Sequence, residues 1–275
     1  MPDRYIPLSQ GHLNLLAQCP RKFQHIYLDQ FASPISPEQQ ASQQWGTQFH
    51  QFMQQHELGL PIEPFLQEDP ALNQCFTAFR QAAPEILTPA PDRRAGQFRQ
   101  SEHQRVLAIG NYLLVAIYDL LIADGTTAQI LDWKTYSRPR NQSWLQENWQ
   151  TRLYPFVLAE TSQYASDCIS MTYWFIPPPG ESGARGPVPQ SLQFDGNSRR
   201  HEKTRQALTQ QLDRLSDWLA RYQSNNEAFP QVSEDQGHCL SCPFALRCHR
   251  YPNDEDAARE EEILSDLTGI AEIAL

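Results

Sequence analysis

Two carboxylates and a lysine are spaced to share one face of a predicted sheet. Asp132 and Lys134 lie two residues apart in the run ILDWK, so on a strand both side chains project from one face while Trp133 projects from the other. Asp119 lies on the preceding predicted strand, and an Asp-Gly turn separates the two strands. We therefore expect Asp119 to lie beside Asp132.

These groups could hold and use a divalent cation. Carboxylate oxygens bind hard cations such as Mg²⁺. A cation held by Asp119 and Asp132 would polarise a phosphodiester and lower the pKa of a bound water molecule, and Lys134 could orient that water or offset developing negative charge. The alternative is a surface ion pair on an edge strand, which is the commoner meaning of an isolated D-x-K.

Three further residues could complete such a site. His50 falls on the apolar side of a predicted helix, where a lone histidine is usually a satisfied core residue. Gln150 and Tyr154 are four residues apart in a predicted helix that follows the Asp132 strand, so they share a helix face. Alone, none of these residues indicates a site.

Four cysteines predict a second metal centre. Cys239, Cys242 and Cys248 form a C-x2-C-x5-C trio, and Cys19 near the start of the chain is the natural fourth ligand. A four-thiolate site of this kind would hold the two ends of the chain together. Zinc is one candidate, and histidines that flank the trio could replace a thiolate: His238 and His249.

The hydrophobic patterning predicts an α/β (α+β) protein with a central mixed sheet flanked by helices. The predicted helices are 9–28, 37–57, 63–87, one beginning at Ser143, and 197–222. The predicted strands are 98–107, 111–122, 127–135, 169–176 and 191–194. The first three strands form an antiparallel meander because turn residues separate them. Ser143 and Gln146 fit a capping box.

Composition and charge indicate a globular chain, of which 40% of the residues are hydrophobic. The net charge of −10 argues against a nucleic-acid partner. Much of this negative charge lies at the end of the chain, however, because residues 253–275 hold eight acidic residues and one basic residue. Neither a secretory signal nor an apolar run long enough to span a bilayer is found, which predicts a cytoplasmic protein with no membrane partner. Basic residues gather in three groups that could be solvated faces or a channel for phosphates: Arg93, Arg94, Arg99 and Arg105; Arg138 and Arg140; Arg199, Arg200, Lys203 and Arg205.

Taken in order, these residues resemble the RecB-like branch of the PD-(D/E)XK nuclease superfamily. That branch carries a Gly-x-x-x-His helix, an Asp ending a strand, a [DE]-x-Lys strand and a Gln-x-x-x-Tyr helix. The corresponding residues are Gly46 to His50, Asp119, Asp132 to Lys134, and Gln150 to Tyr154. The segments around Cys19 and around 229–248 also match, so the resemblance spans residues 8 to 248.

The resemblance implies a restriction-endonuclease-like core and a role for each residue. His50, Asp119 and Asp132 would be metal ligands for Mg²⁺ or Mn²⁺, with the Trp133 carbonyl as a further ligand. Lys134 would be catalytic, and Gln150 and Tyr154 would position water or DNA. Two departures stand out: Ala116 replaces the glycine usual three residues before the strand Asp, and Pro155 follows Tyr154 inside the expected helix.

The cysteines resemble those of the iron–sulfur subset, which includes AddB-type helicase–nuclease domains and small stand-alone nucleases of CRISPR spacer acquisition. This resemblance implies a [4Fe–4S] cluster on Cys19, Cys239, Cys242 and Cys248, in a cysteine-rich annex packed near the N-terminal helix. Zinc stays the alternative. We expect residues 1–252 to form the nuclease domain and 253–275 an acidic tail.

The expected function is metal-dependent hydrolysis of DNA in repair, recombination or CRISPR adaptation, with single strands or ends as substrate. Four aromatic residues could stack unpaired bases or belong to the core: Tyr136, Trp144, Trp149 and Phe156. One alternative is a nuclease fold retained as a DNA-binding scaffold. Another is a subunit that works only with a helicase or integrase protein.

Overall fold

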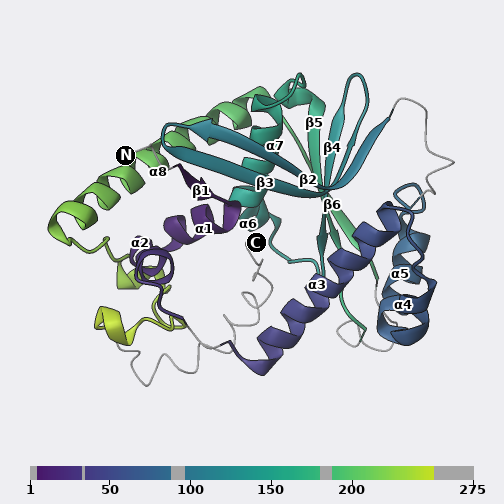
Figure 1. Cartoon of the computed structure of the whole chain (residues 1–275), viewed down its shortest axis with the longest axis horizontal. Helices are drawn as coiled ribbons and strands as arrows, with labels where there is room; N and C mark the ends of the chain where they lie inside the picture. Colours follow the sequence, from purple (N-terminus) through teal and green to yellow (C-terminus); the bar gives the residue numbers. More distant parts are fainter. Residues whose placement is uncertain (1–4, 33–34, 88–96, 180–187, 251–275) are drawn as a thin grey trace.

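A six-stranded mixed sheet forms the centre of the protein (Figure 1). The computed structural model describes residues 5–32, 35–87, 97–179 and 188–250. Its strands are β1 (Ile6–Leu8), β2 (Phe98–Ile109), β3 (Tyr112–Ala123), β4 (Ala128–Lys134), β5 (Ile169–Phe175) and β6 (Gln190–Asp195). Strand β3 pairs with β2 along one edge, and β1 and β4 share its other edge.

The sheet contains both strand directions. β2, β3 and β4 form the predicted antiparallel meander, β5 runs parallel to β4, and β6 returns antiparallel to β5. β1 pairs with β3 in parallel and was not predicted, because three residues are too few for a periodic pattern. The mixed sheet flanked by helices confirms the expected fold class.

Helices cover both faces of the sheet. They are α1 (Gln10–Gln18), α2 (Pro20–Phe23), α3 (Pro37–Glu57), α4 (Glu63–Glu68), α5 (Pro70–Ala82), α6 (Gln142–Glu147), α7 (Trp149–Glu160) and α8 (Ser198–Asn225). Apolar residues of α1, α7 and α8 bury one face, and those of α3 and α5 bury the other. Because strand side chains alternate, Ile130 belongs to the first core and Leu131 to the second.

Prolines divide two helices that the sequence predicts as continuous. The predicted helix 9–28 breaks at Cys19, which is extended at φ −162° and ψ 110° before Pro20. It then ends in a π-helical turn, Gln24–Leu28. The predicted helix 63–87 breaks at Asp69 before Pro70. In both places the ring of the proline disfavours helical backbone at the residue before it.

Two asparagines, rather than the predicted Ser143 capping box, begin the helices after β4. Asn141 caps α6 by accepting from the Ser143 backbone N–H, and Asn148 caps α7 by accepting from Gln150. Asn148 is extended, so it also separates the two helices. The side-chain oxygen of asparagine competes well for these unpaired N–H groups.

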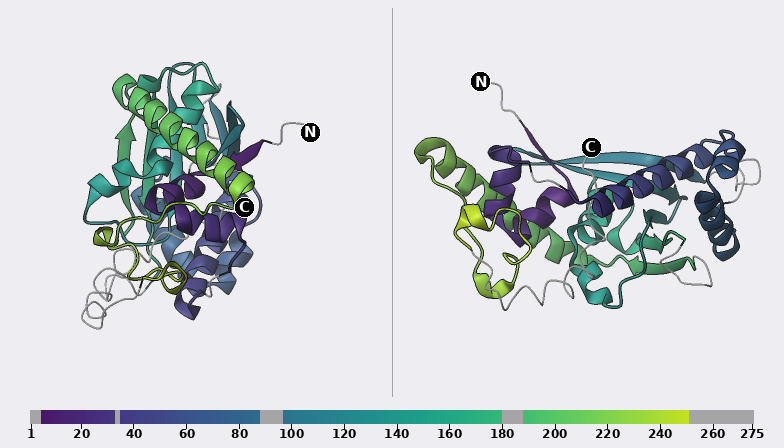
Figure 2. Two further views of the ribbon diagram at one scale, coloured as in Figure 1. Left: turned by 90° about the vertical axis from the view of Figure 1, so that its left-hand side faces the viewer. Right: turned by 90° about the horizontal axis from the view of Figure 1, so that it is seen from below.

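The two ends of the described chain lie together. In both views of Figure 2 the segment after α8 lies beside α1 and α2. Arg21 Nε donates to the Phe229 carbonyl at 2.6 Å, and the Phe229 N–H donates to Gln24 Oε1 at 2.7 Å. The cysteine-rich annex therefore packs near the N-terminal helix, as expected. The predicted tail 253–275, the proline-rich stretch 88–92 and most of the loop 177–189 lie outside the described residues.

A buried ion pair joins α3 to β2 and gives a stability prediction. Arg99 Nε and Nη2 lie 2.7 and 2.8 Å from the two Glu57 carboxylate oxygens, and both side chains are 7% exposed. Arg99→Met should lower the free energy of unfolding by about 3 kcal/mol, because Glu57 stays buried without its charge partner.

Urea denaturation of the single variant and of the Glu57→Leu/Arg99→Met double variant checks this. The double variant should be the more stable of the two, since it removes both charges. Equal unfolding midpoints for the wild type and Arg99→Met would contradict the prediction.

Candidate active site

The site lies where β3 and β4 diverge. Their pairing ends at Leu120 and Leu131, so Asp119 and Asp132 come next on the two strands. The burial pattern of β3 also breaks here. Tyr118 and Leu121 belong to one core, whereas Leu120 belongs to the other. The alternation of side chains along β3 is therefore interrupted at Asp119, whose Oδ2 accepts from the Trp133 backbone N–H at 2.6 Å.

Asp132 is fixed from two sides on the α7 face of the sheet. Lys134 Nζ lies 2.9 Å from Asp132 Oδ1, and Gln150 Nε2 donates to Asp132 Oδ2 at 2.7 Å. All three residues are buried, at 2–7% exposure. The predicted sharing of a face by Asp132 and Lys134 is therefore observed, and the first turn of α7 brings Gln150 to the same carboxylate.

His50 reaches the site from α3 on the opposite face of the sheet. Its Nδ1 lies 3.2 Å from Asp119 Oδ1, and its Nε2 donates to the Trp133 carbonyl at 3.0 Å. Gly46, one turn earlier, allows α3 to come close to the end of β4. A Cβ at Gly46 would lie 3.2 Å from Thr135 Oγ1, tighter than most real contacts.

Glu102 joins the site, and the sequence analysis missed it. The pairs Ser101 with Leu120 and His103 with Tyr118 leave Glu102 opposite Asp119, and its φ of 49° is in the left-handed region. Strained backbone of this kind is often found at functional sites. No periodic signal marks Glu102, because its placement depends on the pairing of β2 with β3 and on the interruption of that pairing at Asp119.

His50, Glu102 and Asp119 form a compact set of donor atoms. Among the described residues they are the one group of three or more His, Cys, Asp or Glu whose ligand atoms all lie within 4.8 Å of one another. Oxygen donors with one imidazole suit Mg²⁺ or Mn²⁺. Asp132, which the sequence predicts as a ligand, instead engages Lys134 and Gln150 in this structure.

The electrostatics of the site favour a positive charge. Burial disfavours the charged form of His50, but the Asp119 carboxylate, the hydrogen bond with it and the Asp132 carboxylate together raise the pKa of His50 to about 9. Burial and the Asp119 carboxylate raise the pKa of Glu102 to about 6, although His50 opposes this. A bound cation would therefore replace the proton on His50 and relieve the repulsion between the carboxylates.

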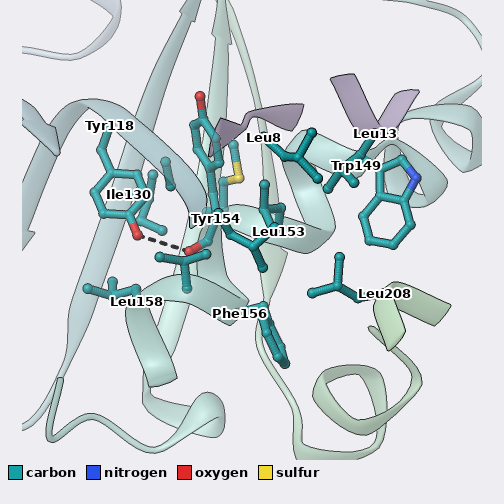
Figure 3. Close-up of a cluster of buried hydrophobic side chains, with 14 of the residues drawn as sticks. Leu8, Leu13, Tyr118, Ile130, Trp149, Leu153, Tyr154, Phe156, Leu158 and Leu208 are labelled. Carbon is teal, nitrogen blue, oxygen red and sulfur yellow. Dashed lines mark hydrogen bonds between the residues drawn. The ribbon is translucent and has the colours of Figure 1, made fainter. Parts of the chain in front are cut away.

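Tyr154 lies deeper than the other predicted site residues. Its ring is 4% exposed and meets the Tyr118 ring edge-on, with 5.3 Å between centroids. Figure 3 shows the Tyr118 hydroxyl donating to the Tyr154 carbonyl, at 3.1 Å. Helix α7 continues through Pro155. The structure thus places Tyr154 in the core next to the site, and its role stays a prediction.

The four predicted cysteine ligands line one cavity. Cys19, Cys239, Cys242 and Cys248 surround it, together with His25 and His238. Burial raises the pKa of Cys239 and Cys248, and the neighbouring thiols raise both further. Within the described ranges no three of the four sulfur atoms lie within 4.8 Å of one another.

Several residues considered for DNA contact have other partners. Arg99 is bound to Glu57, and Arg205 Nη2 lies 2.7 Å from Glu160. Trp149 and Phe156 are core residues at 4% and 1% exposure, whereas Trp144 is 37% exposed. Arg93 and Arg94 lie outside the described residues.

Comparison with known proteins identifies the family of the chain. The family model of the PD-(D/E)XK nuclease superfamily matches residues 7–249, so the chain belongs to that superfamily. A crystal structure of a proposed exonuclease from Eubacterium rectale has the same fold, with a TM-score of 0.50 and 11% identity over 93% of each chain. The structure of SSO0001 matches with a TM-score of 0.38 and 11% identity, over 88% of this chain and 85% of that one. No relative is found among curated proteins.

Glu102→Gln should affect metal binding and stability in opposite directions. A carboxyl group whose pKa is raised on folding loses stabilising free energy as the pH rises through that pKa. Removing the charge should therefore stabilise the metal-free protein at pH 8 by up to about 1 kcal/mol, after allowance for partial exposure. It should have no effect at pH 4, where the carboxyl group is protonated.

Thermal unfolding with and without Mn²⁺ checks this prediction. We expect the increase in Tm on adding Mn²⁺ to be smaller in Glu102→Gln than in the wild type. Glu147→Gln, which removes an exposed carboxylate on α6, is the matched control. An unchanged Mn²⁺-induced shift would remove Glu102 from the ligand set.

Proposed function

We propose that this protein is a metal-dependent DNA nuclease that hydrolyses phosphodiester bonds in single strands or at DNA ends. The observation that carries the proposal is the convergence of His50, Glu102 and Asp119 on one point beside the pair Asp132–Lys134. Membership of a nuclease superfamily supports hydrolysis.

The donor set suits Mg²⁺ or Mn²⁺. Asp119 and His50 would bind the ion, with Glu102, Asp132 and the Trp133 carbonyl completing the set. When bound, the ion polarises a phosphate oxygen and lowers the pKa of a water molecule. Support for this fit comes from the Glu102 and Asp119 carboxylates, which lie close together beside His50. They repel each other, and a bound cation would relieve that repulsion.

The remaining residues would position the reacting groups. Lys134 forms an ion pair with Asp132 and is 7% exposed. In a site with so little solvent, its ammonium group can hold a water molecule or offset negative charge on the phosphate. Gln150 keeps the Asp132 carboxylate oriented through its amide. Tyr154 would support this face of α7 from the core.

The segment after β4 would bind the DNA. Arg138, Arg140 and the exposed Trp144 follow the Lys134 strand directly. Arginines can bind the phosphates, and an exposed indole can stack on an unpaired base. This arrangement favours single strands or frayed ends, whose bases are free to stack.

The cysteine cavity would hold a [4Fe–4S] cluster with a structural role. Its four ligands would be Cys19, Cys239, Cys242 and Cys248, which join the two ends of the domain formed by residues 1–252. Support for the proposal comes from the single cavity that all four cysteines line. Residues 253–275 would be a separate acidic tail.

A substrate panel tests the proposal. End-labelled single-stranded DNA, blunt duplex, tailed duplex and RNA are incubated with the metal-loaded protein and Mn²⁺. We expect cleavage of single-stranded and tailed DNA at least about tenfold faster than of blunt duplex, since stacking on Trp144 needs unpaired bases. Trp144→Ala should remove this preference. Trp149 is buried, so it cannot stack on a base and is not substituted in this test.

A second candidate is a catalytically silent subunit or scaffold. The intact set of Asp119, Asp132 and Lys134 argues against it, because a scaffold has no need of these groups. Binding of DNA without cleavage of any substrate would favour it. Cleavage only after addition of a helicase or integrase would instead assign the chain to a complex in repair, recombination or CRISPR adaptation.

A further inference from the structure

A histidine faces the cysteine cavity in the orientation typical of a metal ligand. His25 is 7% exposed and lines the cavity with the four cysteines. Its Nε2 lies 3.8 Å from Cys248 Sγ. The rings of Phe244 and Phe31 lie 5.2 and 5.6 Å from its ring, which limits its rotation.

A carboxylate fixes which nitrogen of His25 faces the cavity. Nδ1 lies 3.0 Å from Asp29 Oδ2, and because a carboxylate can only accept, Nδ1 is the nitrogen that carries the proton. In the neutral imidazole Nε2 then presents its lone pair to the cavity. Most metal-binding histidines are held in this way, with the other nitrogen donating to a carboxylate.

Asp29 is itself held in place. Its Oδ1 accepts from the Tyr222 hydroxyl at 2.9 Å, and Gln24 Nε2 lies 3.3 Å from its Oδ2. The π-helical turn Gln24–Leu28 supplies this geometry, since it buries both Gln24 and His25 and ends at Asp29. Single π turns inside helices are frequent at functional sites.

The distance between the two donor atoms is short enough for either atom to reach the same metal position. With metal–nitrogen and metal–sulfur distances of ~2.0 and ~2.3 Å, two ligands of a tetrahedral ion lie about 3.5 Å apart. The Nε2 to Sγ distance of 3.8 Å is close to this value. His238 also lines the cavity, but within the described ranges no carboxylate forms a hydrogen bond or ion pair with it.

We infer that His25, oriented by Asp29, is a fifth metal-binding side chain of the cysteine cavity and can hold the metal at the Cys248 position. The inference rests on the proposed metal centre and adds a nitrogen donor to it. Consequently the four cysteines are not equivalent. Loss of Cys248 can be compensated by His25, whereas loss of Cys242 cannot.

Metal retention in paired variants tests the inference. Iron, sulfide and zinc are measured in anaerobically purified wild type, Cys248→Ala, Cys242→Ala and Cys248→Ala/His25→Phe. We expect Cys248→Ala to keep most of its metal, and the added His25→Phe to weaken retention by about 10–100-fold. Phenylalanine keeps the ring packing, and Cys248→Ala/His238→Phe is the matched control, which should behave as Cys248→Ala.

A spectroscopic signal gives an independent readout. Cys248→Ala labelled with ¹⁵N-histidine should show nitrogen hyperfine coupling in the EPR spectrum of its reduced centre, and His25→Phe should abolish the coupling. Metal loss from Cys248→Ala as complete as from Cys242→Ala, or no nitrogen coupling, would overturn the inference. A wild-type protein without metal would overturn the proposed metal centre as well. The metal content of the wild type therefore distinguishes failure of the centre from failure of the His25 inference alone.

Discussion

Asp119→Asn, Asp132→Asn and Lys134→Met should each lower the rate of DNA cleavage by on the order of 10³-fold. Asp119→Asn should do so with little change in Tm, whereas Lys134→Met should also lower Tm because Asp132 stays buried without the lysine. Binding of a cation and activation of water supply several kcal/mol of transition-state stabilisation, and each of these side chains contributes a charge to that arrangement. In Asp119→Asn the amide oxygen can still accept from the Trp133 N–H, the bond that Asp119 makes at 2.6 Å, so the strand ends should stay in place.

The measurement is kcat/KM on end-labelled single-stranded DNA at saturating Mn²⁺, together with thermal unfolding. Glu147→Gln removes an exposed carboxylate nearby and should keep full activity. If Lys134→Met cleaved every substrate as fast as the wild type, the scaffold interpretation would replace the nuclease. A large fall in the Tm of Asp119→Asn would instead mean that the bond from the Asp119 carboxylate to the Trp133 N–H is needed for folding.

Cys19→Ala should remove the metal from the cysteine cavity and lower the free energy of unfolding by about 4 kcal/mol. A cross-link between residue 19 and the trio at 239–248 closes a loop of more than 200 residues, and closing a long loop restricts the unfolded chain most. The annex should stay attached in part, because Arg21 and Gln24 bind the backbone of Phe229 directly.

Elemental analysis and chemical denaturation test this result. About four irons per chain in the wild type and none in Cys19→Ala are expected for a [4Fe–4S] cluster. Cys168→Ala is the matched control, since Cys168 is exposed and lies outside the cavity. About one zinc and no iron would replace the cluster with a zinc site. Unchanged metal content in Cys19→Ala would show that Cys19 is not a ligand.

The fold could be predicted where local patterns were strong. Alternating apolar residues gave the β2–β4 meander, and helix α3 has the predicted bounds Pro37–Glu57. The breaks at Cys19 and Asp69 were missed although prolines follow both. The helical periodicity on either side of each break predicts one continuous helix, and the effect of the proline on the residue before it outweighs that pattern.

The candidate site was only partly predictable. Motif spacing identified Asp132 with Lys134, because the period of a strand dictates a shared face. Glu102 could not be found in this way, since its position depends on the pairing of β2 with β3 and on a positive φ. His25 was missed for a similar reason, as its orientation depends on Asp29 and on packing against Cys248.

Removal and return of the metal tests the central claim most directly. The protein is treated with EDTA, desalted, and assayed on end-labelled single-stranded DNA while Mn²⁺ or Mg²⁺ is titrated back. We expect cleavage to disappear with the chelator and to return with either ion, whereas Asp119→Asn stays inactive at the same metal concentrations. Cleavage that continues undiminished in EDTA would contradict the assignment of His50, Glu102 and Asp119 as a site for the catalytic cation.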